Sequence, residues 1–402
     1  MVFIDGGVCA SKGFLASGIS CGIRKKGKKD LALIISQKRC SAAGVYTKNL
    51  VKGAPITVTQ EHIGDGYARA IIANSGNANT CNVNGIEIAE EMCALVEKFT
   101  GIPSGDVVVA STGVIGQKLS IDPISGGMPA LVMALGINSD DAATAIMTTD
   151  TLKKEAAVSF ELGGRTVRMG AIAKGSGMIH PDMATMLVFV TTDAAISPGM
   201  LQKALNASIQ DSFNMISVDR DTSTNDTMVI LANGMAENEE IVSENADYEA
   251  FSAALLEICL DLSRRIAKDG EGATKLLECV VTGAKSKEDA KKTAKSVICS
   301  PLLKCAMFGS DANWGRVLCA IGYSGADVDV SKVAVGFRSE AGEIKVCENG
   351  GGIDFSEEKA KQVLSCGDII IDVKLGDGEE TATAFGCDLT YDYVRINGDY
   401  RS

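Results

Sequence analysis

The chain has 402 residues and is acidic, since 51 Asp and Glu outweigh 39 Lys and Arg to give a formal net charge of −12. That charge argues against a surface that follows the phosphate backbone of a nucleic acid. No stretch reaches the roughly 18 apolar residues that a membrane helix needs, and the first residues lack the basic region of a signal peptide. We therefore expect a globular protein of the cytoplasm.

The cysteines and the overall composition agree with this expectation. The 13 cysteines form no Cys-x-x-Cys pair, and several, such as Cys259 and Cys319, stand in apolar runs. An odd number without such spacing is typical of reduced thiols in a reducing compartment. With 46% hydrophobic residues, 43 glycines and seven prolines, the chain is aliphatic and rich in turns, not disordered.

Short runs rich in β-branched residues predict strands along the whole chain. The first of them follows the basic run Arg24 to Lys29, which separates two apolar stretches and has Gly27 at its centre, and this pattern predicts a solvated hairpin turn. The predicted strands are residues 31–36, 56–59, 70–73, 107–110, 166–172, 186–190, 228–231, 333–337, 368–373 and 393–396.

Helices are predicted between these strands. The clearest one carries an apolar stripe at helical spacing and ends at Gly270, which we expect in the left-handed conformation. Other helices should begin after Ser139, Ser286 and Ser356. Helices that alternate with strands of both period-two and continuous apolar patterns predict a layered α/β or α+β protein with mixed sheets. The stripe consists of Phe251, Leu255, Ile258, Leu262 and Ile266.

The most informative residue is Thr185. Residues 173–187 read Ala-Lys-Gly-Ser-Gly-Met-Ile-His-Pro-Asp-Met-Ala-Thr-Met-Leu, so a glycine-rich loop brings one hydroxyl to the start of an apolar strand. If the peptide bond between Ala184 and Thr185 is cut, Thr185 gains a free α-amine beside its own hydroxyl. An α-amine, with a pKa of about 7.7 to 8.0, is a better base near neutral pH than a lysine at about 10.4. The alternative is that Thr185 only packs at the strand.

Other catalytic groups are few. The only histidines are His62 and His180, which excludes a three-histidine metal site. His180 lies five residues before Thr185, so it is either an alternative activator of the threonine or a loop histidine that hydrogen-bonds the turn. The glycine clusters match neither a phosphate loop nor a dinucleotide fingerprint, so nucleotide binding has no specific support.

A nucleophile of this kind needs donors for a developing oxyanion. The segment Ser111-Thr-Gly-Val-Ile-Gly116 directly follows the predicted strand 107–110. The Thr112 hydroxyl and the Gly113 amide can converge there, and each such donor is typically worth about 10² to 10³ in rate. An ordinary turn after a strand is the alternative.

Taken together, these segments resemble the ornithine acetyltransferase family, the glutamate N-acetyltransferases of arginine biosynthesis, almost from end to end. The matching segments are Gly6-Gly-Val8, Lys12-Gly-Phe14, Ser41-Ala-Ala-Gly-Val45, Ala73-Asn-Ser-Gly-Asn-Ala-Asn79, Ser111-Thr-Gly-Val-Ile-Gly116, Thr148-Thr-Asp-Thr151, Ala173-Lys-Gly-Ser-Gly-Met178, Ala184-Thr-Met-Leu187, Asp269-Gly-Glu-Gly-Ala-Thr-Lys275, Asn313-Trp-Gly-Arg316 and Gly386-Cys-Asp-Leu-Thr-Tyr-Asp-Tyr-Val-Arg-Ile-Asn-Gly398.

The resemblance implies a layered α-β-β-α sandwich of mixed sheets, similar to that of self-cleaving aminopeptidases. It implies autoproteolysis between Ala184 and Thr185, which would give an α segment of residues 1–184 and a β segment of residues 185–402 in one interdependent fold. Two copies of each segment would form a heterotetramer. Thr185 would carry the acetyl group, Thr112 and Gly113 would form the oxyanion hole, and neither a metal nor a cofactor is implied.

The resemblance also implies the substrates, N-acetylornithine and glutamate. Lys174 could hold a substrate α-carboxylate or tune the α-amine, and Glu271 could pair with the ammonium group of ornithine. The family often ends in threonine where this chain has Ser402, which keeps a hydroxyl. The substrate contacts map onto Thr151, Lys174, Thr185, Glu271, Asn397 and Ser402.

Three alternatives stay open on the sequence alone. The enzyme could also take acetyl from acetyl-coenzyme A and so act as an N-acetylglutamate synthase. It could instead be an N-terminal-nucleophile aminopeptidase or another hydrolase of the related fold, in which water takes the acyl group. A small-molecule binding protein without catalysis would treat Thr185 as a strand residue and the glycines as turns.

Overall fold

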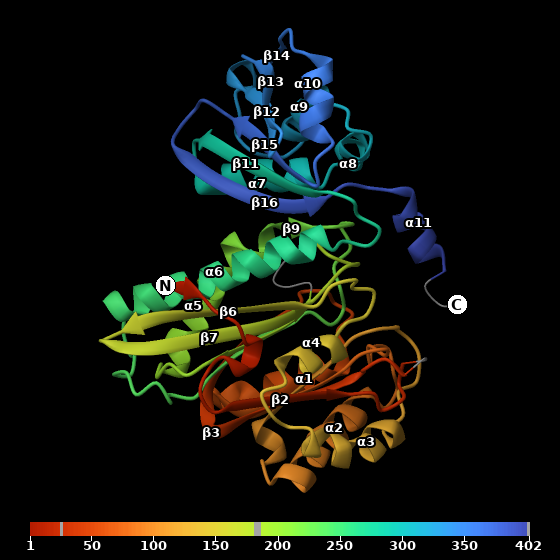
Figure 1. Cartoon of the computed structure of the whole chain (residues 1–402), viewed down its shortest axis with the longest axis vertical. Coiled ribbons are helices and arrows are strands. Elements are labelled where there is room, and N and C mark those ends of the chain that lie inside the picture. Colours follow the sequence, from red (N-terminus) through yellow and green to blue (C-terminus); the bar gives the residue numbers. More distant parts are fainter. Residues whose placement is uncertain (25–26, 181–185, 400–402) are drawn as a thin grey trace. The chain divides into compact units, whose positions relative to one another are not determined.

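The computed structural model describes residues 1–24, 27–180 and 186–399, which divide into two compact units (Figure 1). Unit 1 comprises Met1–Gly175, Pro181–Phe213 and Thr222–Leu262, and unit 2 comprises Ser176–His180, Asn214–Asp221 and Ser263–Ser402. Residues from both sides of position 184 therefore contribute to each unit. The predicted segments 1–184 and 185–402 stay a prediction.

Within its described residues, unit 1 carries one nine-stranded mixed sheet, with the strand order β1-β6-β7-β8-β10-β3-β4-β5 and β2 paired with β3. Every residue of β5, β8 and β10 is buried, and β8 lies between antiparallel β7 and parallel β10. The strands are β1 (Val2–Phe3), β2 (Phe14–Ile19), β3 (Leu31–Tyr46), β4 (Tyr67–Asn74), β5 (Val107–Ser111), β6 (Lys154–Leu162), β7 (Arg165–Lys174), β8 (Leu187–Thr192) and β10 (Thr227–Ala232).

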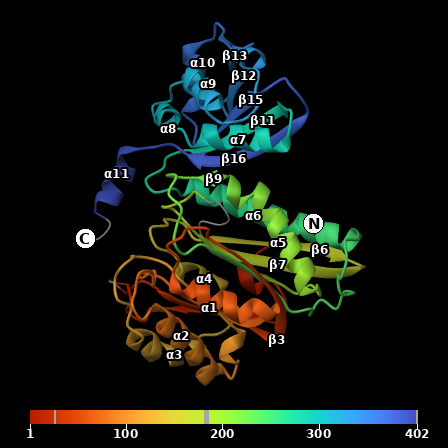
Figure 2. The ribbon, with the colours of Figure 1, turned by 180° about the vertical axis from the view of Figure 1, so that it is seen from behind.

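The long strand β3 joins two layers of this sheet. Its first residues pair with β2 and β4, its register shifts between Ile35 and Cys40, and residues 41–46 then pair with β10. One apolar core contains side chains of both halves, among them Val108 of β5 and Phe189 of β8. Figures 1 and 2 show β2 and β3 in one layer and β6 and β7 in the other.

Helices cover the outer faces of both layers. A second apolar core lies between β4 and β5 and the helices α1, α2 and α3. On the other layer, Phe251 of α6 meets Phe160 of β6 edge to face, with ring centroids 6.4 Å apart. The expected fold class, a layered α/β sandwich of mixed sheets, is confirmed. The helices are α1 (Ala54–His62), α2 (Gly85–Thr100), α3 (Asp122–Met133), α4 (Ser139–Ala145), α5 (Pro198–Asp211) and α6 (Ala246–Lys268).

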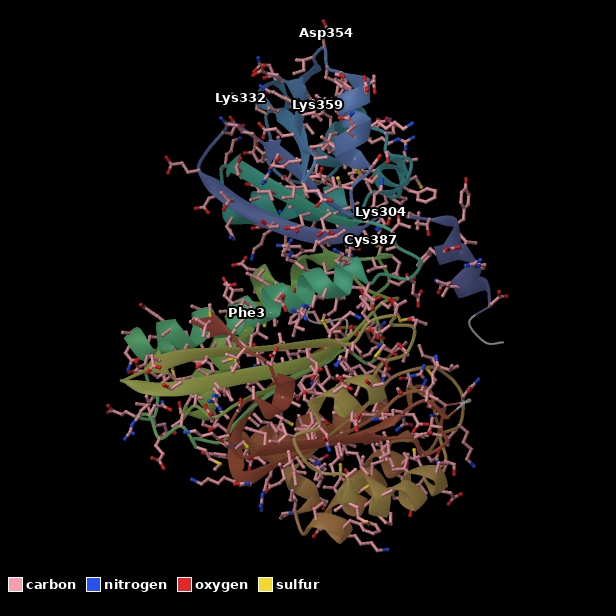
Figure 3. All side chains as sticks on the ribbon, in the orientation of Figure 1. Phe3, Lys304, Lys332, Asp354, Lys359 and Cys387 are labelled. Atoms are coloured by element: carbon pink, nitrogen blue, oxygen red, sulfur yellow. The ribbon has the colours of Figure 1, made fainter. Side chains whose placement is uncertain are left out.

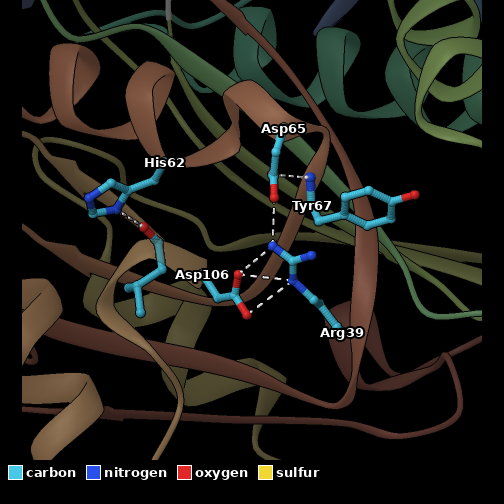
Figure 4. Close-up of polar contacts among 6 residues, drawn as sticks. Arg39, His62, Asp65, Tyr67 and Asp106 are labelled. Atoms are coloured by element: carbon cyan, nitrogen blue, oxygen red, sulfur yellow. Dashed lines mark hydrogen bonds and ion pairs between the residues drawn. The ribbon is translucent and has the colours of Figure 1, made fainter.

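The bend in β3 is held by Arg39. Its guanidinium lies between Asp106, whose carboxylate it meets with two nitrogens, and Asp65, at 2.8 Å and 2.6 Å respectively (Figure 4). The guanidinium carbon also stands 4.9 Å from the centre of the Tyr67 ring. Nearby, Nδ1 of His62 lies 2.8 Å from the Val107 carbonyl oxygen (Figure 4). These contacts fix the bulge against the ends of two neighbouring elements.

Unit 2 has its own core and, in its described residues, a seven-stranded sheet of order β14-β13-β12-β15-β11-β16-β9. Helices α7, α8, α9 and α10 pack on one face of this sheet and share its apolar core (Figures 1 and 2). The elements are β9 (Ile216–Ser217), β11 (Leu276–Ala284), α7 (Lys287–Ile298), α8 (Pro301–Phe308), α9 (Trp314–Gly322), β12 (Ala334–Ser339), β13 (Gly342–Glu348), β14 (Gly351–Gly352), α10 (Glu357–Leu364), β15 (Asp368–Lys374), β16 (Glu380–Cys387) and α11 (Tyr391–Gly398).

Two buried lysines tie these helices to the sheet. Lys275 Nζ donates to the carbonyl oxygens of Met307 at 2.6 Å and Leu364 at 2.7 Å, in the last turns of α8 and α10. A cation at helix C-termini is favoured by the helix dipole. Lys304 of α8 donates to the carbonyl oxygen of Cys387 at the end of β16, and both residues are labelled in Figure 3.

Two predicted strands are helices. Residues 56–59 lie in α1, because Pro55 sits at its first turn and the Thr59 hydroxyl binds the Val109 carbonyl oxygen of β5 at 2.7 Å. Residues 393–396 lie in α11, which begins at Tyr391 and is capped by Thr390, whose hydroxyl accepts a bond from the Tyr393 amide. In both segments capping and packing outweigh the β-propensity of the branched and aromatic residues.

The end of α6 also differs from the prediction. The helix ends at Lys268, and Gly270 does not adopt a positive φ; Gly272 does, at +67°. Gly270 is instead required by space, because a Cβ there would lie 2.8 Å from Cys387 Sγ.

Several other predictions are confirmed. The Ser286 and Ser356 side chains cap α7 and α10, and β2 and β3 form the predicted hairpin, with residues 25–26 of its turn outside the described residues. All 13 cysteines are free thiols. Among the helices of the described ranges, none is long and apolar enough to cross a membrane.

Candidate active site

The predicted nucleophile Thr185 and its neighbour Ala184 lie outside the described residues, as does Ser402. The strand that follows them is well defined. The Met186 carbonyl oxygen accepts a bond from the Thr227 amide at 2.8 Å, and Leu187 pairs with Thr227 on one side and Lys174 on the other. The chain after position 185 thus enters the middle of the unit 1 sheet.

The predicted oxyanion donors lie at the end of β5. Gly113 has a φ of +134°, which turns the chain away from the strand. The Thr112 side chain is only 7% exposed. Within residues 1–24, 27–180 and 186–399, neither the Thr112 hydroxyl nor the Gly113 amide has a hydrogen-bond partner.

The loop after β4 holds this turn. Asn74 accepts bonds from the Thr112 amide and the Ser111 hydroxyl, at 3.0 Å and 2.6 Å. Asn77 pairs with Thr112 as an isolated bridge, and a Cβ on Gly113 would stand 2.4 Å from the carbonyl carbon of Gly76. The sequence offered the segment 73–79 only as part of a resemblance. It supports the turn of residues 111–116, which carries the predicted oxyanion donors and is called the oxyanion turn below.

Asn225 links the turn to the strand after Thr185. Its side-chain amide donates to the carbonyl oxygens of Ala78 at 2.6 Å and Ser111 at 3.0 Å. Two residues later, the Thr227 amide binds Met186. Asn225 is 6% exposed, and a single asparagine in a polar run gave no signal of this role in the sequence.

A buried charged cluster lies at the ends of β6 and β7. The Asp150 carboxylate accepts bonds from Lys154 Nζ and from the Gly175 amide, both at 2.7 Å. Burial alone would raise the pKa of Asp150, but the charges of Lys154 and Lys174 outweigh burial and hold it at about 2. Lys174 Nζ also donates to the Thr148 hydroxyl at 3.3 Å. Lys174 is only 9% exposed and lies beside the ionised carboxylate of Asp150.

The predicted contact Thr151 directly follows Asp150, and its side chain is exposed. Thr151 is therefore a chain neighbour of this cluster, and its segment 148–151 contacts Lys174 through the Thr148 hydroxyl. Asp150 and Lys154 were not singled out as site residues. Asp150 stands in the motif Thr148-Thr-Asp-Thr151, which the sequence offered only as part of the resemblance, so its pairing with Lys154 was not predicted.

The other predicted contacts belong to unit 2. Glu271 is 7% exposed, and its carboxylate accepts a bond from Asn397 of α11 at 2.7 Å. A Cβ on Gly177 would stand 2.3 Å from the carboxylate carbon of Glu271, so a larger residue there would push the Glu271 carboxylate from its position. Glu271 and Asn397, predicted separately, therefore act on each other directly.

His180 and Asp219 lie in the same unit. Nδ1 of His180 is 3.1 Å from the Ser217 hydroxyl, which agrees with a loop histidine that hydrogen-bonds its surroundings. Asp219, which the sequence did not single out, accepts bonds from the amides of Met178 at 2.6 Å and Ile179 at 2.9 Å. Burial raises its pKa above the usual range despite these bonds.

The fold defines a class, a layered α/β protein with mixed sheets, here with a buried charged cluster and a buried threonine after β5 in unit 1. The sequence matches the ArgJ family over residues 15–402. This chain belongs to the ArgJ family.

Two relatives and one solved structure agree. The "Arginine biosynthesis bifunctional protein ArgJ 1" of Clostridium acetobutylicum is 52% identical over 391 residues, which cover 97% of this chain and 96% of the relative. The protein of Caldanaerobacter subterraneus subsp. tengcongensis named "Arginine biosynthesis bifunctional protein ArgJ" is 49% identical over an alignment of 404 residues, which covers 100% of both chains. The crystal structure of the arginine biosynthesis bifunctional protein argJ from Bacillus halodurans aligns with a TM-score of 0.50 and 48% sequence identity. The alignment covers 52% of this chain and 97% of that chain.

Proposed function

We propose that the chain is a glutamate N-acetyltransferase of arginine biosynthesis, which moves an acetyl group from N2-acetyl-L-ornithine to L-glutamate through an ester on Thr185. The names of both relatives refer to arginine biosynthesis. The observation that supports the mechanism is a pair of donors without a partner among the described residues, the Thr112 hydroxyl and the Gly113 amide, on a turn that Asn225 ties to the strand after Thr185.

The proposed cycle begins with cleavage between Ala184 and Thr185. The Thr185 hydroxyl then attacks the acetyl carbonyl carbon of N-acetylornithine while the Thr185 α-amine takes the hydroxyl proton. The oxyanion is stabilised by Thr112 and Gly113. The amide bond breaks, the proton passes to the leaving α-nitrogen, and ornithine departs. The amine of glutamate attacks the ester in the same way, which restores the Thr185 hydroxyl.

The two charged sites would hold the substrates. Lys174, one of two lysines beside Asp150, supplies positive charge for a substrate carboxylate or for lowering the pKa of the Thr185 α-amine. Glu271, oriented by Asn397, is proposed to receive the side-chain ammonium group of ornithine. Thr151 and the hydroxyl of Ser402 complete the proposed set of contacts.

Cleavage is compatible with a stable fold. Strand β8 follows Thr185 and is paired over its whole length with β7, which precedes the cut, and with β10, which follows it. The two segments would therefore stay together after cleavage. We further propose an α2β2 heterotetramer in the cytoplasm.

Acetyl transfer is tested with labelled N-acetylornithine, with and without glutamate. The transferase predicts label in N-acetylglutamate and little acetate. Equal label release with and without glutamate, as acetate, would instead identify a hydrolase. The printed word "bifunctional" in the relatives' names favours one additional activity, acetylation of glutamate from acetyl-coenzyme A, which the same assay measures with that donor.

A further inference from the structure

Arg24 differs from the rest of the basic run to which it belongs. The sequence reads as a solvated turn from Arg24 to Lys29, but the Arg24 side chain is half-buried and its guanidinium has two partners. Nη1 donates to the Met147 carbonyl oxygen at 2.7 Å, and Nη2 donates to the Thr148 carbonyl oxygen at 3.0 Å. A planar guanidinium binds the two carbonyl groups with two separate nitrogens in a fixed geometry, whereas a lysine offers a single nitrogen on a flexible chain.

The backbone of Arg24 is fixed as firmly as its side chain. Asp30, whose side chain is completely buried, accepts bonds from the amides of Cys21 at 2.7 Å, Gly22 at 3.2 Å and Arg24 at 2.8 Å. The hairpin therefore presents the Arg24 side chain from a rigid base.

The aliphatic part of Arg24 packs on the support of the oxyanion turn. A Cβ on Gly76 would lie 2.7 Å from Arg24 Cγ, and a Cβ on Gly113 would lie 2.4 Å from the Gly76 carbonyl carbon. Arg24, Gly76 and Gly113 are thus stacked without room for one additional carbon atom. A shift of Arg24 toward Gly76 would therefore press on Gly113 through this contact.

The head of Arg24 holds the other half of the proposed site. The carbonyl groups it binds belong to the segment that carries Thr148, whose hydroxyl accepts a bond from Lys174, and Asp150, which binds the Thr148 and Gly175 amides. One side chain therefore contacts the support of the oxyanion turn with its stem and the segment beside Lys174 with its head.

We propose that Arg24 is a positioning residue that sets the distance between the oxyanion donors and the Lys174 cluster. This inference rests on the proposed function, because it assigns Arg24 to the same acyl-transfer site. The role assigned to Arg24 requires no contact with the substrate or the reacting atoms. Arg24 acts by keeping Gly113 and Lys174 in a fixed position relative to each other. A displacement of about 1 Å at such groups can cost 10²-fold in rate.

The test uses the full chain with three variants. Arg24→Met keeps an apolar stem on Gly76 but removes the guanidinium, and Arg24→Lys restores the charge with a single donor head. Arg69→Met is the matched control, because Arg69 is also half-buried and also donates to two successive carbonyl oxygens, those of Ser36 and Gln37, both at 3.1 Å. Those carbonyls lie in the β3 bulge.

For each protein, kcat and KM for N-acetylornithine are measured well below its melting temperature, together with hydrogen exchange of peptides that contain residues 111–116 and 147–151. We expect Arg24→Met to lower kcat/KM by about 10²-fold, with a lower kcat and a raised KM, because the oxyanion donors and the Lys174 cluster shift relative to each other. A loss of folded protein would lower kcat and leave KM unchanged. Arg24→Lys should recover part of the loss, and Arg69→Met should stay within about twofold of wild type.

The outcomes separate this inference from the proposed function. An active wild type with Arg24→Met no worse than Arg69→Met would overturn the role of Arg24 and leave the proposed function intact. If the wild type transfers no acetyl group, the proposed function fails, and hydrogen exchange then decides the inference. Faster exchange of both peptides in Arg24→Met alone supports the coupling of the two segments, and unchanged exchange in either peptide refutes it.

Discussion

Gly113 lies so close to Gly76 that a Cβ on Gly113 would stand 2.4 Å from the Gly76 carbonyl carbon. Gly113 also has a φ of +134°, which L-residues rarely adopt. The turn after β5 can therefore be built only with glycine at this position.

Gly113→Ala should displace the oxyanion turn. We expect acetyl transfer to fall by at least about 10²-fold, the typical cost of one oxyanion donor. Gly105→Ala is the control, because nothing lies within 4 Å of a Cβ there. Steady-state rates of both variants, with unfolding curves, test this prediction, and a Gly113→Ala enzyme of normal kcat would contradict it.

Asp150→Asn should destabilise unit 1. It leaves the buried Lys154, whose side chain is 1% exposed, beside a neutral amide, and breaking a buried ion pair typically costs about 3 to 5 kcal/mol. Asp140→Asn, which removes an exposed partner of Lys153, should cost less than about 1 kcal/mol. Urea unfolding at pH 7 compares the two, and equal losses would refute the buried pair.

The same carboxylate predicts a pH dependence of stability. Its pKa falls from the ordinary value of 3.8 to about 2 on folding, so its contribution is complete above the unfolded pKa and is lost as the pH falls through the folded one. Between about pH 4 and pH 2, wild type should lose roughly 2 kcal/mol more of its unfolding free energy than Asp150→Asn does. Parallel losses in the two proteins would show that Asp150 does not titrate as described.

Asn397→Ala should weaken substrate binding more than turnover. The Glu271 carboxylate loses its 2.7 Å partner, and a hydrogen bond to a charged group contributes about 1.5 to 3 kcal/mol. We expect KM for N-acetylornithine to rise about tenfold with a smaller change in kcat. The control on the same helix is Arg395→Ala, an exposed residue paired with Asp392. Equal KM values for the two variants would count against the role of Asn397.

Most of the strands of unit 1 were predictable because their apolar runs are continuous. Residues 107–110 and 228–231 need no tertiary information to be read as buried strands. Residues 56–59 misled the prediction because Ile, Thr and Val favour strands locally, while Pro55 and the Thr59 bond to Val109 act only in the folded chain.

The candidate site was predictable to the extent that it follows chain order. Thr112 and Gly113 stand directly after a strand, so their position could be inferred. The contacts of Gly113 with Gly76, of Asn225 with Ser111 and of Arg24 with Met147 span 37, 114 and 123 residues. Such contacts depend on how distant loops pack in the folded chain, and the spacing of residues along the sequence does not predict that packing.

The central claim is that Thr185 becomes an N-terminal nucleophile and carries the acetyl group. Denaturing intact-mass measurement of wild type after incubation with N-acetylornithine alone tests it most directly. The account predicts two segments, of residues 1–184 and 185–402, with one acetyl group on the second that disappears when glutamate is added. Thr185→Ala should remain a single unmodified chain of 402 residues. A single uncut wild-type chain, or an acetyl group absent from the second segment, would contradict the account.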